Sequence, residues 1–269
     1  MSRPNFKHIT SRCFVNAPWY DLKERYLDIF LTHGIQPEIG LEGLCLYDEP
    51  REEFIKIAKI LQNNNLECTL HAPFFDLAPG ALDPKILETS RNKLRKAFSL
   101  IEVFRPKSVV CHLNYEQNKQ GYKEKEWRMA AIATWRELTE IAAASGTILM
   151  LENTYENSPE AHEAILSALD SPHARFCLDV GHLMTFAKTD WQKWLPRLSP
   201  WLGQLHLHDN NGNSDQHLGL GLGSFDFVGL FDFLAAKNLH PLVTLEPHSE
   251  EDLWQALEYL ERTGLLELV

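Results

Sequence analysis

The feature that most constrains this chain is a regular alternation of short apolar runs, rich in β-formers, with longer segments of helical period. The strand candidates lie near positions 7–14, 36–41, 66–71, 107–112, 147–152, 174–179, 202–208 and 241–246. Between them, apolar residues recur at spacings of three and four over positions 51–62, 82–104, 123–144, 159–169, 191–198, 225–237 and 250–262. Strict alternation of strands and helices predicts a parallel sheet with helices outside it, because parallel neighbours need a crossover connection.

The number of these units decides how the sheet is arranged. The chain has 269 residues, and no linker rich in proline or glycine and no shift in composition divides its eight strand–helix units. A closed barrel of eight such units typically takes about 250 residues. We therefore predict an α/β fold, a (β/α)8 TIM barrel in which residues 1–269 form a single domain, and favour it over a doubly wound sheet.

Composition and charge exclude several classes of protein. Hydrophobic residues make up 44% of the chain and charged residues 23%, which suits a sizeable core and excludes disordered, collagenous and coiled-coil proteins. The formal net charge of −11 argues against binding to nucleic acid through a general basic field. A local phosphate site stays open, since bound metal ions would reverse the local sign of charge.

Cysteine usage and the N-terminal segment bear on the compartment. The five cysteines are odd in number and form no CxxC pair, so we expect reduced thiols rather than a disulfide framework or a zinc ribbon. The segment MSRPNFKHIT has no apolar stretch of signal-peptide length, and the longest apolar run, near 141–151, is interrupted by Ser145 and Gly146. We expect a cytoplasmic protein that does not enter a membrane.

Titratable side chains follow the predicted strands at the points where the strands end. The third to eighth strands run into the motifs CTLHAP, SVVCHLN, ILMLENT, FCLDVGH, GQLHLHDN and LVTLEPH. In a barrel these ends share one face, and that face carries the active site. Six consecutive strands therefore bring imidazole or carboxylate groups to one place, namely His71, His112, Glu152, Asp179, His182, His206, His208 and Glu246.

This cluster indicates bound metal ions. A lone His or Asp after a strand is more often a capping or hydrogen-bonding residue, so the prediction rests on the whole set. Carboxylates that converge in a barrel mouth would repel one another and lose solvation, and interleaved neutral His fits them best around divalent cations. The mixed ligands suit zinc, with manganese or iron as alternatives. In the next loop, Asp215 and His217 are two residues apart and can face the same ion, and the glycines at 219, 221 and 223 let the backbone pass closely.

These motifs resemble those of the xylose isomerase-like TIM barrels, the AP endonuclease family 2, which includes endonuclease IV and many sugar isomerases and epimerases. Endonuclease IV binds three zinc ions with nine side chains, and all nine have a counterpart in this sequence. The resemblance implies that His71 and His112 hold one ion and that Glu152 bridges it to a second. The resemblance also implies that Asp179, His206 and Glu246 bind the second ion, and that His182, Asp215 and His217 bind a third.

A site with several ions favours a metal-dependent hydrolase acting on a phosphoester. Two or three cations lower the pKa of a bridging water and clamp phosphate oxygens. In endonuclease IV a basic loop after the second strand enters DNA, whereas the stretch GLEGLCLYDEPREEF is acidic here. We therefore expect a small or non-duplex substrate and no binding of duplex DNA. Around the ions, we predict that His208, Asp209 and His248 contact the substrate or orient a ligand.

The alternative is a sugar or sugar-phosphate isomerase or epimerase. In that branch of the family, the resemblance implies one metal ion held by Glu152, Asp179, His206 and Glu246. Glu152 and Glu246 are the catalytic pair in this hypothesis, exchanging a carbon-bound proton from opposite sides of the substrate. A binding barrel without catalysis is disfavoured because no ligand has been replaced. The metal count separates the two enzymes, about three ions for the hydrolase and one for the isomerase.

Overall fold

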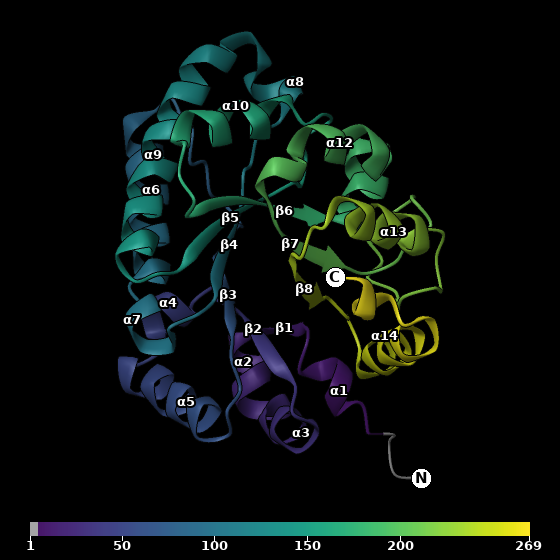
Figure 1. Cartoon of the computed structure of the whole chain (residues 1–269). Coiled ribbons are helices and arrows are strands. Elements are labelled where there is room, and N and C mark those ends of the chain that lie inside the picture. Colours follow the sequence, from purple (N-terminus) through teal and green to yellow (C-terminus); the bar gives the residue numbers. More distant parts are fainter. Residues whose placement is uncertain (1–4) are drawn as a thin grey trace.

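A computed structural model describes residues 5–269 and confirms the predicted (β/α)8 TIM barrel (Figure 1). Each strand pairs in parallel with the next, and the eighth closes on the first. The strands are β1 Phe14–Pro18, β2 Gln36–Gly40, β3 Thr69–His71, β4 Ser108–His112, β5 Ile148–Glu152, β6 Ala174–Asp179, β7 Leu202–Leu207 and β8 Leu242–Leu245. The N-terminal segment for which we predict no signal peptide begins outside the described residues.

Helices surround the strands, as Figure 1 shows for α5, α6, α9, α10, α12, α13 and α14. Every segment predicted to be helical contains helix. The helices are α1 Lys7–Thr10, α2 Trp19–Asp21, α3 Leu27–His33, α4 Cys45–Asp48, α5 Arg51–Asn63, α6 Pro84–Phe98, α7 Ile101–Phe104, α8 Gln117–Gln120, α9 Glu124–Ala144, α10 Glu160–Leu169, α11 Val180–His182, α12 Trp191–Leu198, α13 Phe227–Lys237 and α14 Glu250–Thr263. Short 3-10 and π turns complete them: η1 Leu22–Tyr26, η2 Gly121–Lys123, η3 Leu183–Ala187, η4 Ser199–Trp201 and η5 Leu265–Leu268.

The first strand is the one element that the sequence analysis placed wrongly. Residues 7–10 form helix α1, and the strand begins only at Phe14 and continues to Pro18. Phe6 and Ile9 are apolar at a spacing of three, and both are buried at this helical turn. The shift matters for the site, because it brings Asn16 to the mouth of the barrel.

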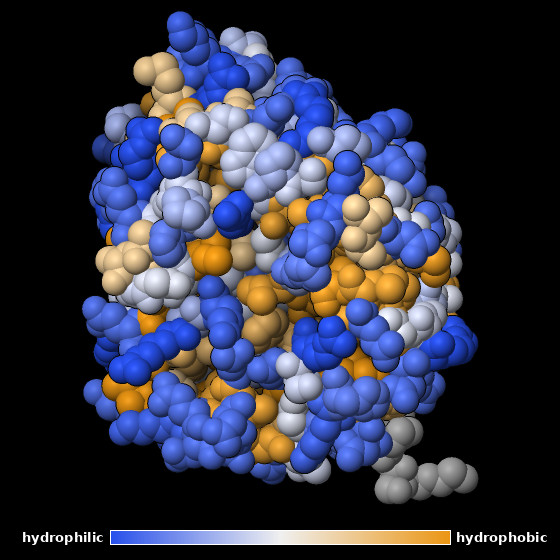
Figure 2. All heavy atoms as spheres, in the orientation of Figure 1, coloured by the Kyte–Doolittle hydropathy of each residue, from blue (hydrophilic) through white to orange (hydrophobic). Residues whose placement is uncertain are grey.

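The core lies mainly between the barrel and its helices, with a smaller cluster inside the barrel. The outer core is one large group of buried apolar residues, whereas the inner cluster consists of Val110, Met150 and Cys177 on β4, β5 and β6. All five cysteines are buried free thiols, as predicted. Hydrophilic side chains cover most of the margin of the face seen in Figure 2, and hydrophobic ones gather nearer its centre. No helix among residues 5–269 is long and apolar enough to cross a membrane.

Candidate metal centre

A cavity of about 500 Å³ opens at the carboxyl ends of the strands. This volume is in the range of about 300–1,000 Å³ that is usual for small-molecule sites. Most of the predicted site residues line it: His71, His112, Glu152, His182, Asp215, His217, Glu246 and His248. Asp179, His206 and His208 are fully buried and contact these residues from below. The strand ends therefore meet at one site, as the sequence motifs predict.

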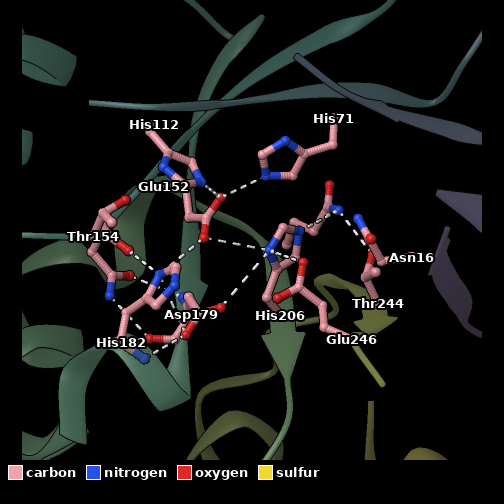
Figure 3. A network of polar contacts seen from close by, with 12 residues as sticks. Asn16, His71, His112, Glu152, Thr154, Asp179, His182, His206, Thr244 and Glu246 are labelled. Atoms are coloured by element: carbon pink, nitrogen blue, oxygen red, sulfur yellow. Dashed lines mark hydrogen bonds and ion pairs between the residues drawn. The ribbon is translucent and has the colours of Figure 1, made fainter. Parts of the chain in front are cut away.

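Glu152, at the end of β5, lies at the centre of the site. Its Oε2 atom is 3.2 Å from Nε2 of His71 and 3.2 Å from Nε2 of His112. Its Oε1 atom is 3.2 Å from Nδ1 of His182 and 3.5 Å from Nδ1 of His206 (Figure 3). Burial alone would raise the pKa of this carboxyl, but the surrounding imidazoles, His112 and His206 first, hold its pKa well below the usual range.

A second group forms where β6, β7 and β8 end. Nδ1 of His206 lies 3.0 Å from Oε1 of Glu246 and 4.0 Å from Oδ2 of Asp179. The ligand atoms of Glu152, Asp179 and His206 lie within 4.8 Å of one another, and so do those of His71, His112 and Glu152. One cation could be held by either trio, with Glu152 common to both.

Unpartnered buried atoms show that this donor set fits a cation. Oε1 of Glu152 and Nδ1 of His206 are buried and have no hydrogen-bond partner, and they face each other across 3.5 Å. Buried polar atoms are nearly always paired in proteins, so atoms that are left open toward one point indicate a missing partner. Carboxylate oxygens and imidazole nitrogens are ligands for zinc and for similar divalent ions.

Asp215 organises a third group nearer the surface. Its Oδ2 atom is 3.1 Å from Nε2 of His217 and 3.5 Å from Nε2 of His182, and its buried Oδ1 atom has no hydrogen-bond partner. The ring of His217 lies between the parallel rings of His208 and His248, with centroids 3.7 and 3.9 Å away. The predicted pairing of Asp215 with His217 is therefore present in the loop, and His248 extends the stack at the cavity wall.

The turn after β6 couples two of the predicted ligands. Oδ1 of Asp179 accepts a hydrogen bond from the backbone N–H of His182 and caps the short helix α11, so this Asp also has the capping role that is common after a strand. His208 lies behind it, with Nε2 at 3.2 and 3.3 Å from the two carboxylate oxygens. A Cβ atom at Gly181 would come within 1.9 Å of the His208 ring, so only glycine fits between them.

Asp209 neither lines the cavity nor contacts the residues that do. Its carboxylate is fully buried and accepts hydrogen bonds from the backbone N–H groups of Asn210, Gly221, Gly223 and Phe225. A Cβ atom at Gly223 would lie 2.3 Å from its Oδ1 atom. The structure therefore gives Asp209 the role of holding the loop that carries Asp215 and His217, rather than contact with a substrate.

Sequence reasoning missed two polar residues of the site. Asn153 exchanges two hydrogen bonds of 2.9 Å with the backbone of Asp179 and fastens the end of β5 to that of β6. Glu38, in the middle of β2, is fully buried and lies 3.1 Å from Nε2 of His206. Burial would raise the pKa of Glu38, but His206 and further donors hold it at about 2. An acidic residue in the middle of the buried strand segment QPEIG is the signal that could have revealed Glu38.

Comparison with known sequences then decides the family. Residues 36–263 match the family described as xylose isomerase-like TIM barrel. The chain belongs to this family. An uncharacterized protein of Methanocaldococcus jannaschii is 26% identical in an alignment of 207 residues that covers 73% of this chain and 69% of that protein. Membership of the family agrees with the prediction that the chain is an enzyme.

Solved structures of the same fold include two with informative descriptions. A D-tagatose 3-epimerase-like protein has a TM-score of 0.81 at 23% identity, covering 95% of this chain and 98% of its own. A Thermus thermophilus protein soaked with zinc chloride has a TM-score of 0.78 at 23% identity, covering 94% of this chain and 98% of its own. At this identity the likeness establishes the fold.

The first prediction concerns Glu152. Glu152→Gln keeps the size of the side chain and removes the charge that both trios share. Loss of a residue that only orients a metal ligand lowers metal affinity by up to about 100-fold. Because Glu152 is itself a predicted ligand, its loss is expected to lower zinc affinity by at least that much. Elemental analysis and competition with a chromophoric chelator measure this. Glu140→Gln, an exposed change on α9, is the matched control. Full zinc content in Glu152→Gln would contradict the assignment.

The second prediction concerns Asp209. Asp209→Ala leaves backbone N–H groups of the loop without their acceptor, and such a loss is expected to lower the free energy of unfolding by about 1–3 kcal/mol. Urea unfolding followed by circular dichroism measures it. Asp209→Asn, which retains one acceptor oxygen, is expected to fall in between. Stability equal to that of the unchanged protein would show that the loop does not depend on this carboxylate.

Proposed function

We propose that this protein is a metal-dependent epimerase or isomerase that moves a carbon-bound proton of a free ketose. The observation that carries the proposal is the convergence of Glu152 and Glu246, from β5 and from the end of β8, on the same atom, Nδ1 of His206. The carboxylates thus flank one position at the floor of a cavity of suitable size for a sugar. The predicted alternative function is thereby preferred over phosphoester hydrolysis.

The chemistry follows from this arrangement. A divalent cation held by Glu152, Asp179, His206 and Glu246 would polarise the carbonyl and a neighbouring hydroxyl of the substrate. Under that influence, one of the two glutamates removes the proton from the carbon beside the carbonyl, and the other returns a proton. Return to the opposite face of the same carbon gives an epimer, whereas return to the neighbouring carbon gives an isomer.

The cavity wall favours a sugar without a phosphate group. No Lys or Arg lines the cavity among residues 5–269, while the carboxylates of Asp21 and Glu42 do line it. A phosphorylated substrate would meet these carboxylates without a Lys or Arg to pair with its phosphate. Aromatic rings offer an apolar surface instead, with Phe74 stacked on His112 at 4.5 Å and Tyr155 packed edge-on against Phe186 at 5.0 Å. Such surfaces suit the C–H face of a neutral sugar.

The comparisons support the choice of reaction. The fold is similar to that of the D-tagatose 3-epimerase-like protein over nearly the whole length of both chains. The family description also refers to a sugar isomerase. Zinc was introduced into the similar Thermus thermophilus protein, and the donor set here is also suited to zinc, with manganese or iron as alternatives.

Phosphoester hydrolysis is the second candidate, and one observation favours it. Beyond the ligands of a single ion, the trio of His71, His112 and Glu152 and the group around Asp215 could each hold a further cation. Several neighbouring cations would serve phosphoester hydrolysis rather than proton transfer. The number of ions that bind therefore separates the two functions.

The third prediction tests that number. For a single-metal isomerase, we expect about one tightly bound ion per chain, and the double change Asp215→Ala with His217→Ala is expected to keep it while raising KM severalfold, because these residues then only contact substrate. Elemental analysis and steady-state kinetics measure both quantities. About three ions in the unchanged protein, with about one lost in the double variant, would instead establish the hydrolase.

The fourth prediction tests the reaction itself. The metal-loaded protein is expected to incorporate deuterium from heavy water into a free ketose beside its carbonyl, as followed by proton NMR across a panel of ketoses. Glu246→Gln is expected to slow this exchange by about 100-fold or more, the usual contribution of a general acid–base group. Sugar phosphates serve as comparison substrates and are expected to react poorly. Cleavage of phosphoesters with no exchange on any ketose would refute the proposed function.

A further inference from the structure

The interior of the barrel contains a hydrogen-bonded polar group directly beneath the metal ligands. At its centre is the carboxylate of Glu38, which is completely buried. Its Oε2 atom accepts hydrogen bonds from Oγ1 of Thr69 at 2.8 Å, Nε2 of Gln204 at 2.7 Å and Oγ1 of Thr244 at 3.1 Å. Its Oε1 atom lies 3.1 Å from Nε2 of His206. Side chains from β2, β3, β7 and β8 thus meet at one carboxylate.

Burying the carboxylate of Glu38 inside the barrel costs free energy. The interior of such barrels is usually filled by branched apolar side chains, as β4, β5 and β6 do here with Val110, Met150 and Cys177. A buried carboxylate loses its hydration, and apart from His206 the donors that face Glu38 are neutral. Asn16, which lines the cavity, donates to Oε1 of Glu38 at 3.4 Å, and His206 is the predicted metal ligand that Glu38 contacts directly.

The two nitrogens of His206 face different surroundings. Nε2 lies 3.1 Å from Oε1 of Glu38, which only accepts hydrogen bonds, and 3.4 Å from the amide nitrogen of Gln204. Nδ1 also faces carboxylates, but two of them: Glu246 at 3.0 Å and Glu152 at 3.5 Å, both of them predicted metal ligands. A cation at the position where those two carboxylates converge needs the lone pair of Nδ1, which leaves the hydrogen on Nε2, where Glu38 can accept it (Figure 3).

The donors of Glu38 are themselves fixed, so its carboxylate has little freedom to turn away. The amide oxygen of Gln204 accepts a hydrogen bond of 2.6 Å from Oγ of Ser108, which directs the Gln204 amide nitrogen toward Glu38. The same nitrogen also lies 3.0 Å from Oγ1 of Thr244. All four of these side chains are buried.

We propose that Glu38 is a positioning residue that holds the His206 imidazole with its hydrogen on Nε2, so that Nδ1 is the atom that binds the divalent cation. This inference rests on the proposed function only in that a cation binds at His206. Carboxylates that accept from the second nitrogen of a metal-binding His fix its tautomer and orientation, and their loss typically lowers metal affinity about 10–100-fold.

The test uses the zinc-loaded protein labelled with ¹⁵N in its histidines. We expect proton–nitrogen spectra to show a hydrogen on Nε2 of His206 and none on Nδ1, with the signals assigned by their absence in His206→Asn. In Glu38→Gln, the amide can donate to Nε2, so we expect the Nε2–H signal to be lost or weakened. Zinc affinity, measured by competition with a chromophoric chelator, is expected to fall about 10–100-fold.

The control separates positioning from packing. Thr69→Val removes one donor to Glu38 but leaves the carboxylate facing His206, so zinc affinity and the Nε2–H signal are expected to stay close to those of the unchanged protein. Glu38→Asp is expected to restore part of the affinity lost in Glu38→Gln. A hydrogen on Nδ1 of His206 in the unchanged, zinc-loaded protein would overturn the inference. Equal zinc affinity in Glu38→Gln, or an equal loss in Thr69→Val, would also overturn it.

These outcomes are distinguishable from failure of the proposed function. A protein that binds zinc with Nε2–H on His206 but exchanges no proton on any ketose refutes the reaction and leaves the role of Glu38 intact. If the unchanged protein exchanges the proton but Glu38→Gln binds zinc as tightly as the unchanged protein, the proposed function stands and the role of Glu38 is refuted.

Discussion

Closure of eight parallel strands into a ring is the constraint on which the site depends. Because all strands run in the same direction, their carboxyl ends form a single rim, and alternate side chains on each strand point into the ring. The last inward positions of neighbouring strands, such as His112 and Glu152, lie side by side in register. Most of the predicted ligands lie on the strands or in the turn after β6, so no loop has to fold over to bring them together. Glu246 directly follows β8, and Asp215 and His217 lie in the loop after β7.

Electrostatics divides the interior into two parts. Negative groups come from Glu38, Glu152, Asp179 and Glu246, and imidazoles lie between them. Carboxylates at such burial are tolerable only with a positive partner, which can be a proton on an imidazole or a cation shared among the ligands. The apolar cluster on β4 to β6 fills another part of the interior.

Much of the fold and most of the site could be read from the sequence, since each ligand motif follows a strand of clear pattern. The position of the first strand could not be read from the sequence, because Phe6 and Ile9 suit a strand as well as the helical turn that they form. The part that Asp209 plays in the loop could not be read either, because a titratable residue after a strand resembles a ligand. Strand alternation places His206 and His208 inward, and therefore Asp209 outward. Glu38 lies within a strand rather than at its end, so a search of strand ends could not find it.

The loop held by Asp209 has a consequence for how this family diversifies. Asp215 and His217 belong to a loop that the buried carboxylate of Asp209 helps to hold, whereas Glu152, Asp179 and His206 lie on strands. Mutation can therefore add or remove the ligands of an outer ion without disturbing the strands that carry the inner ones. In evolutionary terms, the loop is an exchangeable module, and one ancestral barrel can give rise to lineages with different numbers of metal ions.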